Sequence, residues 1–350
     1  MWFTSDNAGP AAPEIMAAVT RANADYASSY GDDQIMDQVR DQIRKTFEAP
    51  EAAVYLVATG TAANVLGLAC LCPPWGTIYC HRNAHIEEDE CGAPEFYTDG
   101  AKLTLLEGDD AKIDPASLQQ AINFTARAGV HNVQKGALSI TNATEAGAVY
   151  SLAEIKVLST IAKKAEIPVH MDGARFANAL VSLGCSPAEM TWKAGVDVLS
   201  FGGTKNGCMG VEAVVIFDPK RAWEFELRRK RGGHLLSKHR YMSAQMEAYL
   251  KDDLWLRLAS HANAMAKELS RGLMQTEGAQ LLHPTQANAV FAAWPRAGHQ
   301  RVQDAGGKYY FWPFNQSLEG PESENLSARL VCNWSTTIED IETFVTAVRG

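Results

Sequence analysis

The first 220 residues alternate short apolar runs with longer stretches in which apolar residues recur at helical spacing. The apolar runs predict buried strands, because a strand covered on both faces needs no polar alternation. A proline after a possible N-cap aspartate predicts a helix over 115–127, and a capping-box pattern predicts another over 152–165. The predicted strands cover 54–58, 77–81, 103–106, 137–141, 169–171, 198–201 and 213–217. This alternation predicts a largely parallel, doubly wound sheet with helices on both faces.

The rhythm changes after about residue 231. Helix-forming residues dominate from 242 to 273, strand-like runs follow, and a last helix is predicted from residue 337. The later strands are predicted over 289–294, 309–314 and 328–334. We therefore expect a large α/β domain over 1–238, including the N-terminal segment, and a small C-terminal α+β domain over 239–350. The aromatic run 309–312 is expected in the core of the small domain, with a site wall as the alternative.

The composition argues against a disordered, membrane-spanning, secreted or nucleic-acid-binding protein. The 350 residues suffice for about two domains, and 46% hydrophobic against 21% charged residues excludes global disorder. The net charge of −9 argues against a nucleic-acid or anionic-membrane partner, and no apolar run is long enough to span a bilayer. The N-terminus lacks the pattern of a secretory signal. Seven cysteines without a CxxC pair predict reduced thiols in the cytoplasm and no metal site.

Three polar features fall where an open α/β sheet places its ligands, at the carboxyl ends of strands. Gly60 and Thr61 begin a helix directly after a strand. This turn is either an ordinary connection or a cup whose backbone N–H groups bind a phosphate. Asp172 and Arg175 are a structural ion pair, or they bind a cationic heterocycle and an anionic substrate group. Lys205 lies among glycines after another strand. It is either a mobile lysine in a surface loop or an amine that forms a Schiff base with a ligand.

The order of these features favours one cofactor. Pyridoxal 5'-phosphate requires a phosphate anchor, a carboxylate against its pyridine nitrogen and a lysine for the Schiff base. A nucleotide-binding Rossmann oxidoreductase is the alternative from another class, but neither glycine-containing turn matches its GxGxxG fingerprint. A non-catalytic binding protein with the same fold also stays open at this point.

Several segments match a known family across nearly the whole chain. The most specific are Asp-Gly-Ala-Arg at 172–175 and Thr-Lys-Asn-Gly at 204–207. Support comes from 4–7, 30–33, 59–64, His85, 107–112, His170, 200–203 and 329–331. With these segments the sequence resembles the low-specificity L-threonine aldolases, including their phenylserine-aldolase relatives, within fold type I of the pyridoxal-phosphate enzymes.

The resemblance implies a fold type I transferase-like architecture and a lyase activity. Such an enzyme cleaves L-threonine, L-allo-threonine or related β-hydroxy-α-amino acids, such as phenylserine, to glycine and an aldehyde. The alternatives within the same cofactor class are a β-eliminating lyase and a serine hydroxymethyltransferase-like enzyme. The resemblance also implies a homo-oligomer of at least two subunits, with a tetramer expected.

The resemblance further implies roles for the residues that match the cofactor site. Lys205 would form the Schiff base, and Asp172 would bind the pyridine nitrogen. Gly60 and Thr61 would hold the phosphate. His85 would stack on the ring close to the substrate β-hydroxyl group, which makes it the first candidate for the catalytic base.

Other matching residues would bind the substrate. Ser5, Arg175 and Arg329 would hold the substrate carboxylate, because the guanidinium fork meets a carboxylate with two hydrogen bonds. The resemblance also implies that Arg175 contacts the cofactor. Tyr30 would reach the site of a neighbouring subunit.

Two segments depart from the family pattern. Many members carry a second active-site histidine after the strand that corresponds to 137–141, but segment 141–147 contains none. His131 lies on the wrong side of that strand for a substitute, so the group that governs the β-hydroxyl proton stays open. The family's usual Gly-Gly-Gly-Met-Arg is also altered, which leaves open whether Arg231 or Lys238 reaches a phosphate across the interface.

Overall fold

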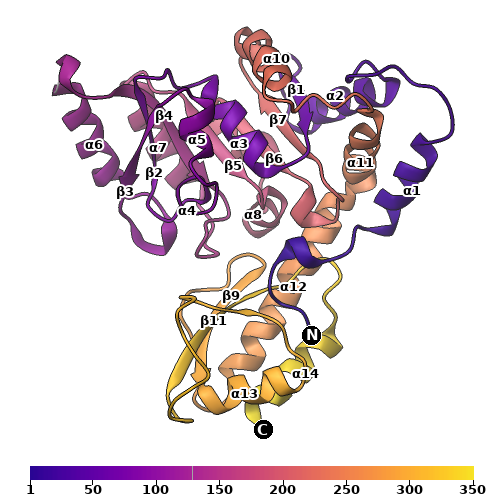
Figure 1. Cartoon of the computed structure of the whole chain (residues 1–350), viewed down its shortest axis with the longest axis vertical. Helices are drawn as coiled ribbons and strands as arrows, with labels where there is room; N and C mark the ends of the chain where they lie inside the picture. The colour runs from indigo at the N-terminus through magenta and orange to yellow at the C-terminus, as the bar shows by residue number, and fades with distance from the viewer. Residues whose placement is uncertain (128) are drawn as a thin grey trace.

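The computed structural model describes residues 1–127 and 129–350. Its main layer is a seven-stranded sheet of order β1-β7-β6-β5-β4-β2-β3 (Figure 1). The strands are β1 Ala53–Val57, β2 Gly76–His81, β3 Lys102–Leu106, β4 Gln134–Thr141, β5 Val169–Gly173, β6 Val198–Gly202 and β7 Glu212–Ile216. The strands from β2 to β6 pair in parallel, whereas β7 is antiparallel to both of its neighbours. Each of the seven predicted strands is present, which confirms the mostly parallel α/β sheet.

Helices cover both faces of this sheet (Figure 1). One face packs against a core that includes residues of α2, α6, α7, α8 and α11, and the other against a core that includes α3 and Phe225 of α10. The helices in the first 250 residues are α1 Pro13–Ala22, α2 Gln34–Thr46, α3 Gly60–Ala69, α4 His85–Glu88, α5 Ala93–Tyr97, α6 Pro115–Arg127, α7 Leu152–Lys164, α8 Phe176–Leu183, α9 Pro187–Met190, α10 Ala222–Arg231 and α11 Arg240–Leu250.

The predicted helix starts are confirmed at two places. Asp114 accepts a hydrogen bond from the Ser117 N–H at 2.9 Å ahead of α6. Ser151 and Glu154 form the predicted capping box of α7. These side chains satisfy N–H groups that a helix cannot pair internally, and so they fix where each helix begins.

The helical stretch predicted over 242–273 is two helices. Asp252 and Asp253 take left-handed backbone angles, with φ of 50° and 54°, and end the continuous helix between α11 and α12 Leu254–Met274. Buried residues of α11 belong to the core of the large sheet, whereas the second half of α12 packs in a separate core. The domain boundary at 238/239 stays a prediction, and these cores place α11 beside the large sheet.

The C-terminal part forms a second, antiparallel sheet of order β10-β11-β9-β8. Its strands and helices are β8 Gln280–Leu281, β9 Ala289–Pro295, β10 Tyr310–Phe311, β11 Asn325–Val331, α13 Arg296–Asp304 and α14 Ile338–Arg349. Trp294, Leu330 and Phe344 are fully buried between this sheet and α12 to α14. Phe3 lies in the same core, so the chain begins in the small part and then crosses to the large one (Figure 1).

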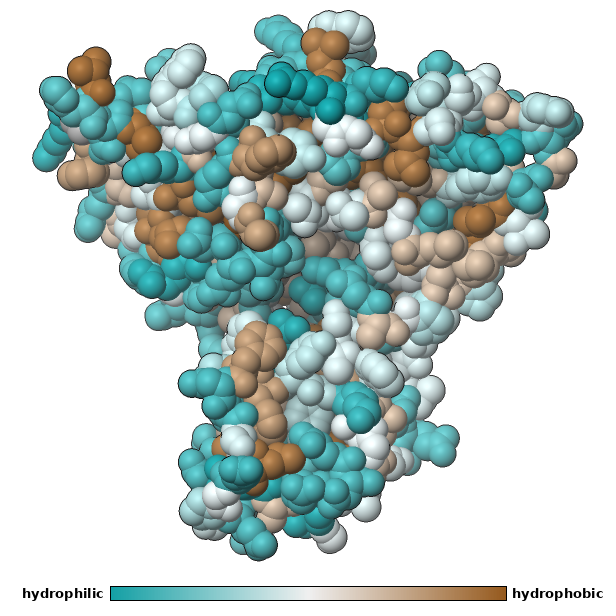
Figure 2. Space-filling model, in the orientation of Figure 1, coloured by the Kyte–Doolittle hydropathy of each residue, from teal (hydrophilic) through white to brown (hydrophobic). Residues whose placement is uncertain are grey.

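The surface is hollowed where the wide part built on the seven-stranded sheet meets the narrower C-terminal part (Figure 2). Hydrophilic side chains gather around this waist. None of the helices in the described ranges combines the length and apolar character that a bilayer span requires.

Candidate functional site

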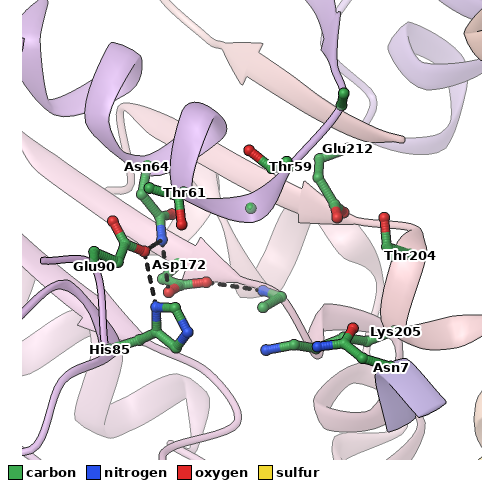
Figure 3. Close-up of a pocket in the computed structure, with 13 residues that line it drawn as sticks. Asn7, Thr59, Thr61, Asn64, His85, Glu90, Asp172, Thr204, Lys205 and Glu212 are labelled. Carbon is green, nitrogen blue, oxygen red and sulfur yellow. Dashed lines mark hydrogen bonds and ion pairs between the residues drawn. The ribbon is translucent and has the colours of Figure 1, made fainter. Parts of the chain in front are cut away.

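A cavity of about 300 Å³ lies at the carboxyl ends of β5 and β6, next to the N-terminus of α3 (Figure 3). Five of the predicted residues line it, and they come from four separate segments of the chain. The full wall consists of Asn7, Ala58, Thr59, Gly60, Thr61, Asn64, His85, Glu90, Asp172, Ala174, Thr204, Lys205 and Glu212. The fold therefore assembles the predicted phosphate cup, acid, histidine and lysine in one place.

The cup is the first turn of α3. The Thr59 side chain accepts a hydrogen bond from the Ala62 N–H at 3.1 Å and fixes the start of the helix. The N–H groups of Gly60 and Thr61 precede the internal hydrogen bonds of the helix and lie at the positive end of its dipole. A Cβ atom built on Gly60 would meet nothing within 4 Å, so open space lies over the backbone there. This space and these donors fit a phosphate group.

Lys205 lies in a turn that glycines make possible. Gly203 allows close packing, because a Cβ atom there would lie 2.6 Å from the Val211 carbonyl oxygen, and Gly207 has a φ of 102°. The Gly207 carbonyl oxygen accepts a hydrogen bond from the Ala12 N–H at 2.8 Å, which ties this turn to the N-terminal segment. Figure 3 shows no hydrogen bond or ion pair from Lys205 to the rest of the wall. Its amine is therefore available to a ligand in the cavity.

Asp172 is the next-to-last residue of β5 and is only 3% exposed. One carboxylate oxygen accepts a hydrogen bond from the Asn64 amide at 2.9 Å, and the other accepts one from the Ala174 N–H at 2.9 Å (Figure 3). Two donors hold the carboxylate in a fixed direction, and donors to a carboxylate favour its charged form. Such a group suits a protonated ring nitrogen.

His85 is oriented by a carboxylate that the sequence analysis did not single out. Its Nδ1 lies 2.8 Å from Glu90 Oε1, and the same oxygen accepts a hydrogen bond from Asn64 Nδ2 at 3.0 Å. The hydrogen bond to Glu90 raises the pKa of His85, burial opposes the shift, and Asp172 adds to it. Because the carboxylate can only accept, Nδ1 carries the proton and Nε2 is left for a ligand. The sequence contained little indication that Glu90 orients His85, because Glu90 is the last of four consecutive acidic residues.

Glu212 is a second wall residue that the sequence analysis missed. It is 6% exposed and begins β7, a strand that is otherwise apolar. Burial raises the pKa of this carboxyl group to about 7, although hydrogen bonds with Thr204 and Gly203 and the charge of Lys205 oppose the shift. A lone acid inside an apolar strand is a signal that sequence reasoning can use, because an unpaired buried charge is costly.

Arg175 lies beside the main cavity, at the start of α8, and is held by an acid. Its Nε donates to Asp6 Oδ2 at 2.7 Å, and its Nη2 donates to Asp6 Oδ1 at 2.9 Å. Burial raises the pKa of Asp6, but Arg175 and Lys205 outweigh that effect and lower it. Two of the guanidinium nitrogens are thus engaged within the chain, and Asp6 is the partner that sequence reasoning did not supply.

Arg329 is the less engaged of the two arginines. It projects from β11 of the small sheet, and its guanidinium carbon lies 5.0 Å from the Trp312 ring centroid and 5.8 Å from that of Tyr310. Its buried Nε has no hydrogen-bond partner. Arg175 and Arg329 line one small cavity next to the main one, together with Ala143, Thr144, Glu145, Gly147, Ala287, Asn288, Ala289 and Val331. A buried cation with an unsatisfied donor fits an anionic substrate group.

The aromatic run 309–312 contributes both to the core of the small domain and to the surroundings of Arg329. Tyr309 packs against the small-domain core, and Tyr310 and Trp312 flank Arg329.

Two predicted residues lie outside the walls of both cavities. Ser5 caps a short 3₁₀ turn by accepting a hydrogen bond from the Asn7 N–H at 3.1 Å, and it is Asn7 that reaches the main wall. Tyr30 is 46% exposed, with the Lys230 amine 4.7 Å from its ring centroid. The Tyr30 N–H donates to the Ser237 carbonyl oxygen at 3.0 Å.

Neither of the other two histidines considered lines the cavity. His131 is exposed and precedes β4, whereas the cavity lies at the opposite, carboxyl ends of the parallel strands. His170 is fully buried between the Ser139 and Ser200 hydroxyl groups, each 3.0 Å from a ring nitrogen. Burial lowers the pKa of His170 to about 4, so it is a neutral core residue.

Comparisons with known proteins identify the family of the chain. A family model described as beta-eliminating lyase matches residues 3–295. A low-specificity L-threonine aldolase of Pseudomonas aeruginosa is 40% identical over 347 residues, which cover 99% of this chain and 96% of the relative. A relative of the same description from a Pseudomonas species is 40% identical over 334 residues, with 95% and 93% covered.

Solved structures give the same result. A threonine aldolase of Leishmania major superposes with a TM-score of 0.91 at 26% identity, covering 99% of this chain and 98% of that one. The family match, the full-length relatives and this superposition confirm the resemblance seen in the sequence: the chain belongs to the beta-eliminating lyase family and to the low-specificity L-threonine aldolases.

Proposed function

We propose that the protein cleaves L-threonine, L-allo-threonine and related β-hydroxy-α-amino acids, phenylserine included, to glycine and an aldehyde. Membership of the family makes it a lyase that depends on pyridoxal phosphate. The observation that carries the proposal is the unpaired Lys205 amine, in one cavity with the Asp172 carboxylate and the open first turn of α3. Arg329 adds an anion site next to this cavity.

The cofactor, when bound, supplies an electron sink for the charge left on the substrate Cα. In our proposal, Gly60 and Thr61 bind its phosphate, and Asp172 keeps its ring nitrogen protonated. Arg329 binds the substrate carboxylate and so orients the bond between Cα and Cβ. Nε2 of His85 accepts the proton of the β-hydroxyl group, directly or through a water molecule. This assignment is supported by the Glu90 hydrogen bond, which in the neutral ring places the proton on Nδ1 and leaves Nε2 to accept one.

The same proposal covers substrate range and location. Tyr310 and Trp312 beside Arg329 support acceptance of an aromatic aldehyde group, because aromatic rings pack favourably against one another. All seven cysteines are unpaired, which supports a reducing, cytoplasmic compartment.

The direct test incubates the purified, cofactor-loaded protein with threonine, allo-threonine, phenylserine and serine, and quantifies glycine, aldehyde and pyruvate. We expect glycine and the matching aldehyde in equal amounts from the first three. Pyruvate from serine without glycine from the others would favour a β-eliminating lyase. Glycine formed only in the presence of tetrahydrofolate would favour the serine hydroxymethyltransferase-like alternative.

Glu90→Gln is expected to move the acidic limb of the pH profile of kcat/KM to lower pH, by about one unit. The hydrogen bond to Glu90 raises the pKa of His85, and the neutral amide removes the charge that stabilises the protonated ring. A base must be neutral to act, so a lower pKa keeps His85 active at lower pH. Glu87→Gln, in the same acidic run but exposed, is the matched control and should leave the limb in place. Identical profiles for all three proteins would contradict this role of Glu90.

We also propose a homo-oligomer, at least a dimer with a tetramer expected, in which each site is completed by a neighbour. Tyr30, Lys230 and Ser237 lie together and outside the wall of their own cavity. This patch contains Tyr30, which the family resemblance assigns to a neighbour's site, and Ser237, which directly precedes Lys238 in the sequence. In a symmetric dimer each subunit would give and receive the same contacts.

Subunit mixing tests the shared site. A Lys205→Ala subunit and a Tyr30→Ala/Lys238→Ala subunit, each impaired alone, are combined under conditions that allow exchange. Hybrids should regain intact sites, so activity should rise above the sum of the two parents. Verified exchange with activity at the parental sum, or an active monomer in light scattering, would show that the sites are not shared.

A further inference from the structure

Glu212 is an acid at the rim of a cup that fits an anion. In the large sheet it pairs with Val57 of β1 on one side and with Gly202 of β6 on the other. Its Oε2 accepts a hydrogen bond from the Gly203 N–H at 2.6 Å. Figure 3 shows the carboxylate next to Thr204 and on the side of the cavity where Thr59 lies, and Gly60 lines the same cavity.

The surroundings of Glu212 offer little to neutralise a negative charge. The titratable groups around it are Lys205, Cys208 and Tyr249. Burial raises the pKa of the Cys208 thiol and of the Tyr249 phenol well above their usual ranges, so both stay neutral. Lys205 is the remaining positive group of the three, and in the proposed function it reacts with the cofactor.

A phosphate in this cup would therefore lie near a buried carboxyl group. Two negative charges at short range in a medium of low dielectric constant repel strongly. A carboxylic acid avoids the repulsion and supplies an O–H donor, and the raised pKa of Glu212 means that its protonation near neutral pH requires little free energy.

We propose that the cup binds the phosphate of the cofactor with Glu212 protonated, so that Glu212 donates a hydrogen bond to a phosphate oxygen and binding takes up one proton from solvent. The inference rests on the phosphate position given under the proposed function. It assigns to Glu212 a role in making cofactor affinity depend on pH.

The sign of the effect follows from linkage. At a pH below the pKa of the free protein, Glu212 already carries its proton and adds no pH dependence. Above that pKa each binding event requires an additional proton, so the dissociation constant rises about tenfold per pH unit from this group alone. Gln has the same shape and a permanent N–H donor, so Glu212→Gln removes this dependence.

The test titrates the apoprotein with pyridoxal phosphate from about pH 6 to about pH 9 and follows the visible absorption band. Wild type, Glu212→Gln and the exposed control Glu342→Gln are compared. We expect the ratio of the wild-type dissociation constant to that of Glu212→Gln to rise about 50-fold between pH 7 and pH 9. Glu342→Gln should follow wild type. Pyridoxal, which lacks the phosphate, should show the same pH dependence with all three proteins.

Calorimetry of the wild-type protein in two buffers of different ionisation enthalpy gives a readout that needs no variant. At about pH 8, pyridoxal phosphate should take up about one more proton than pyridoxal. Parallel titration curves for wild type and Glu212→Gln, or equal proton uptake for the two ligands, would overturn the role of Glu212 while leaving the cofactor site intact. No visible band with any of the proteins would overturn the site itself and the inference with it.

Discussion

Borohydride treatment of the cofactor-loaded protein is expected to fix pyridoxal phosphate irreversibly on the peptide that contains Lys205. The amine of Lys205 makes no hydrogen bond or ion pair within the cavity wall, and Gly203 lets its turn pack closely against Val211. Lys205→Ala should show neither the visible band of the bound cofactor nor labelling, and its turnover should fall by about 10³-fold or more.

Lys220→Ala is the control for this experiment, because Lys220 is exposed and remote from the wall of the cavity. It should keep the band, the labelled peptide and the turnover. A label on a different lysine, or a protein that gains no visible band with added cofactor, would show that Lys205 is not the attachment point.

Asp172→Asn is expected to lower kcat by about 10³-fold while the dissociation constant of the cofactor changes by less than about tenfold. The amide can still accept the hydrogen bond from Ala174, so the site should keep its shape. What is lost is the negative charge opposite the ring nitrogen. That charge matters most when electron density moves into the ring, and an interaction that is stronger in the transition state acts on rate rather than on binding.

The measurement compares kcat with cofactor affinity in fully loaded protein. Asn64→Ala is an informative companion, because it removes one donor to Asp172 but leaves the charge in place. Its kcat should fall far less than that of Asp172→Asn. Near-normal turnover of loaded Asp172→Asn would contradict the assignment of this carboxylate.

Local patterns in the sequence predicted most of the large sheet. Apart from the edge strand β3, its strands are mostly buried on both faces, so they form nearly continuous apolar runs. The caps of α6 and α7 are side chains close in the sequence to the N–H groups that they bind. The direction of β7 was not predictable in this way, since an antiparallel strand in the same core has the same composition. Nor was the break at Asp252 and Asp253, because both residues fit a helix surface until their backbone angles are known.

Candidate site residues were predictable where the residue type and its local position together indicate a chemical role. A lysine among glycines and an acid at a strand end did so, and the family resemblance supplied His85 and Arg329. Contacts between distant segments were not predictable. Asp6 meets Arg175 across 169 positions of sequence, and nothing in the acidic run before Cys91 indicates that Glu90 is the acid that faces His85.

The N-terminal segment that begins in the small core has a mechanical consequence. Phe3 is buried beside the four-stranded sheet, Asp6 holds Arg175 next to the cavity, and Ala12 is hydrogen-bonded to the turn that contains Lys205. The segment thus links both halves of the molecule, and we expect a displacement of the C-terminal half to shift the Lys205 turn. For protein engineering, substitutions in the first twelve residues are therefore expected to change the alignment of the site, in which Asn7 lines the cavity wall.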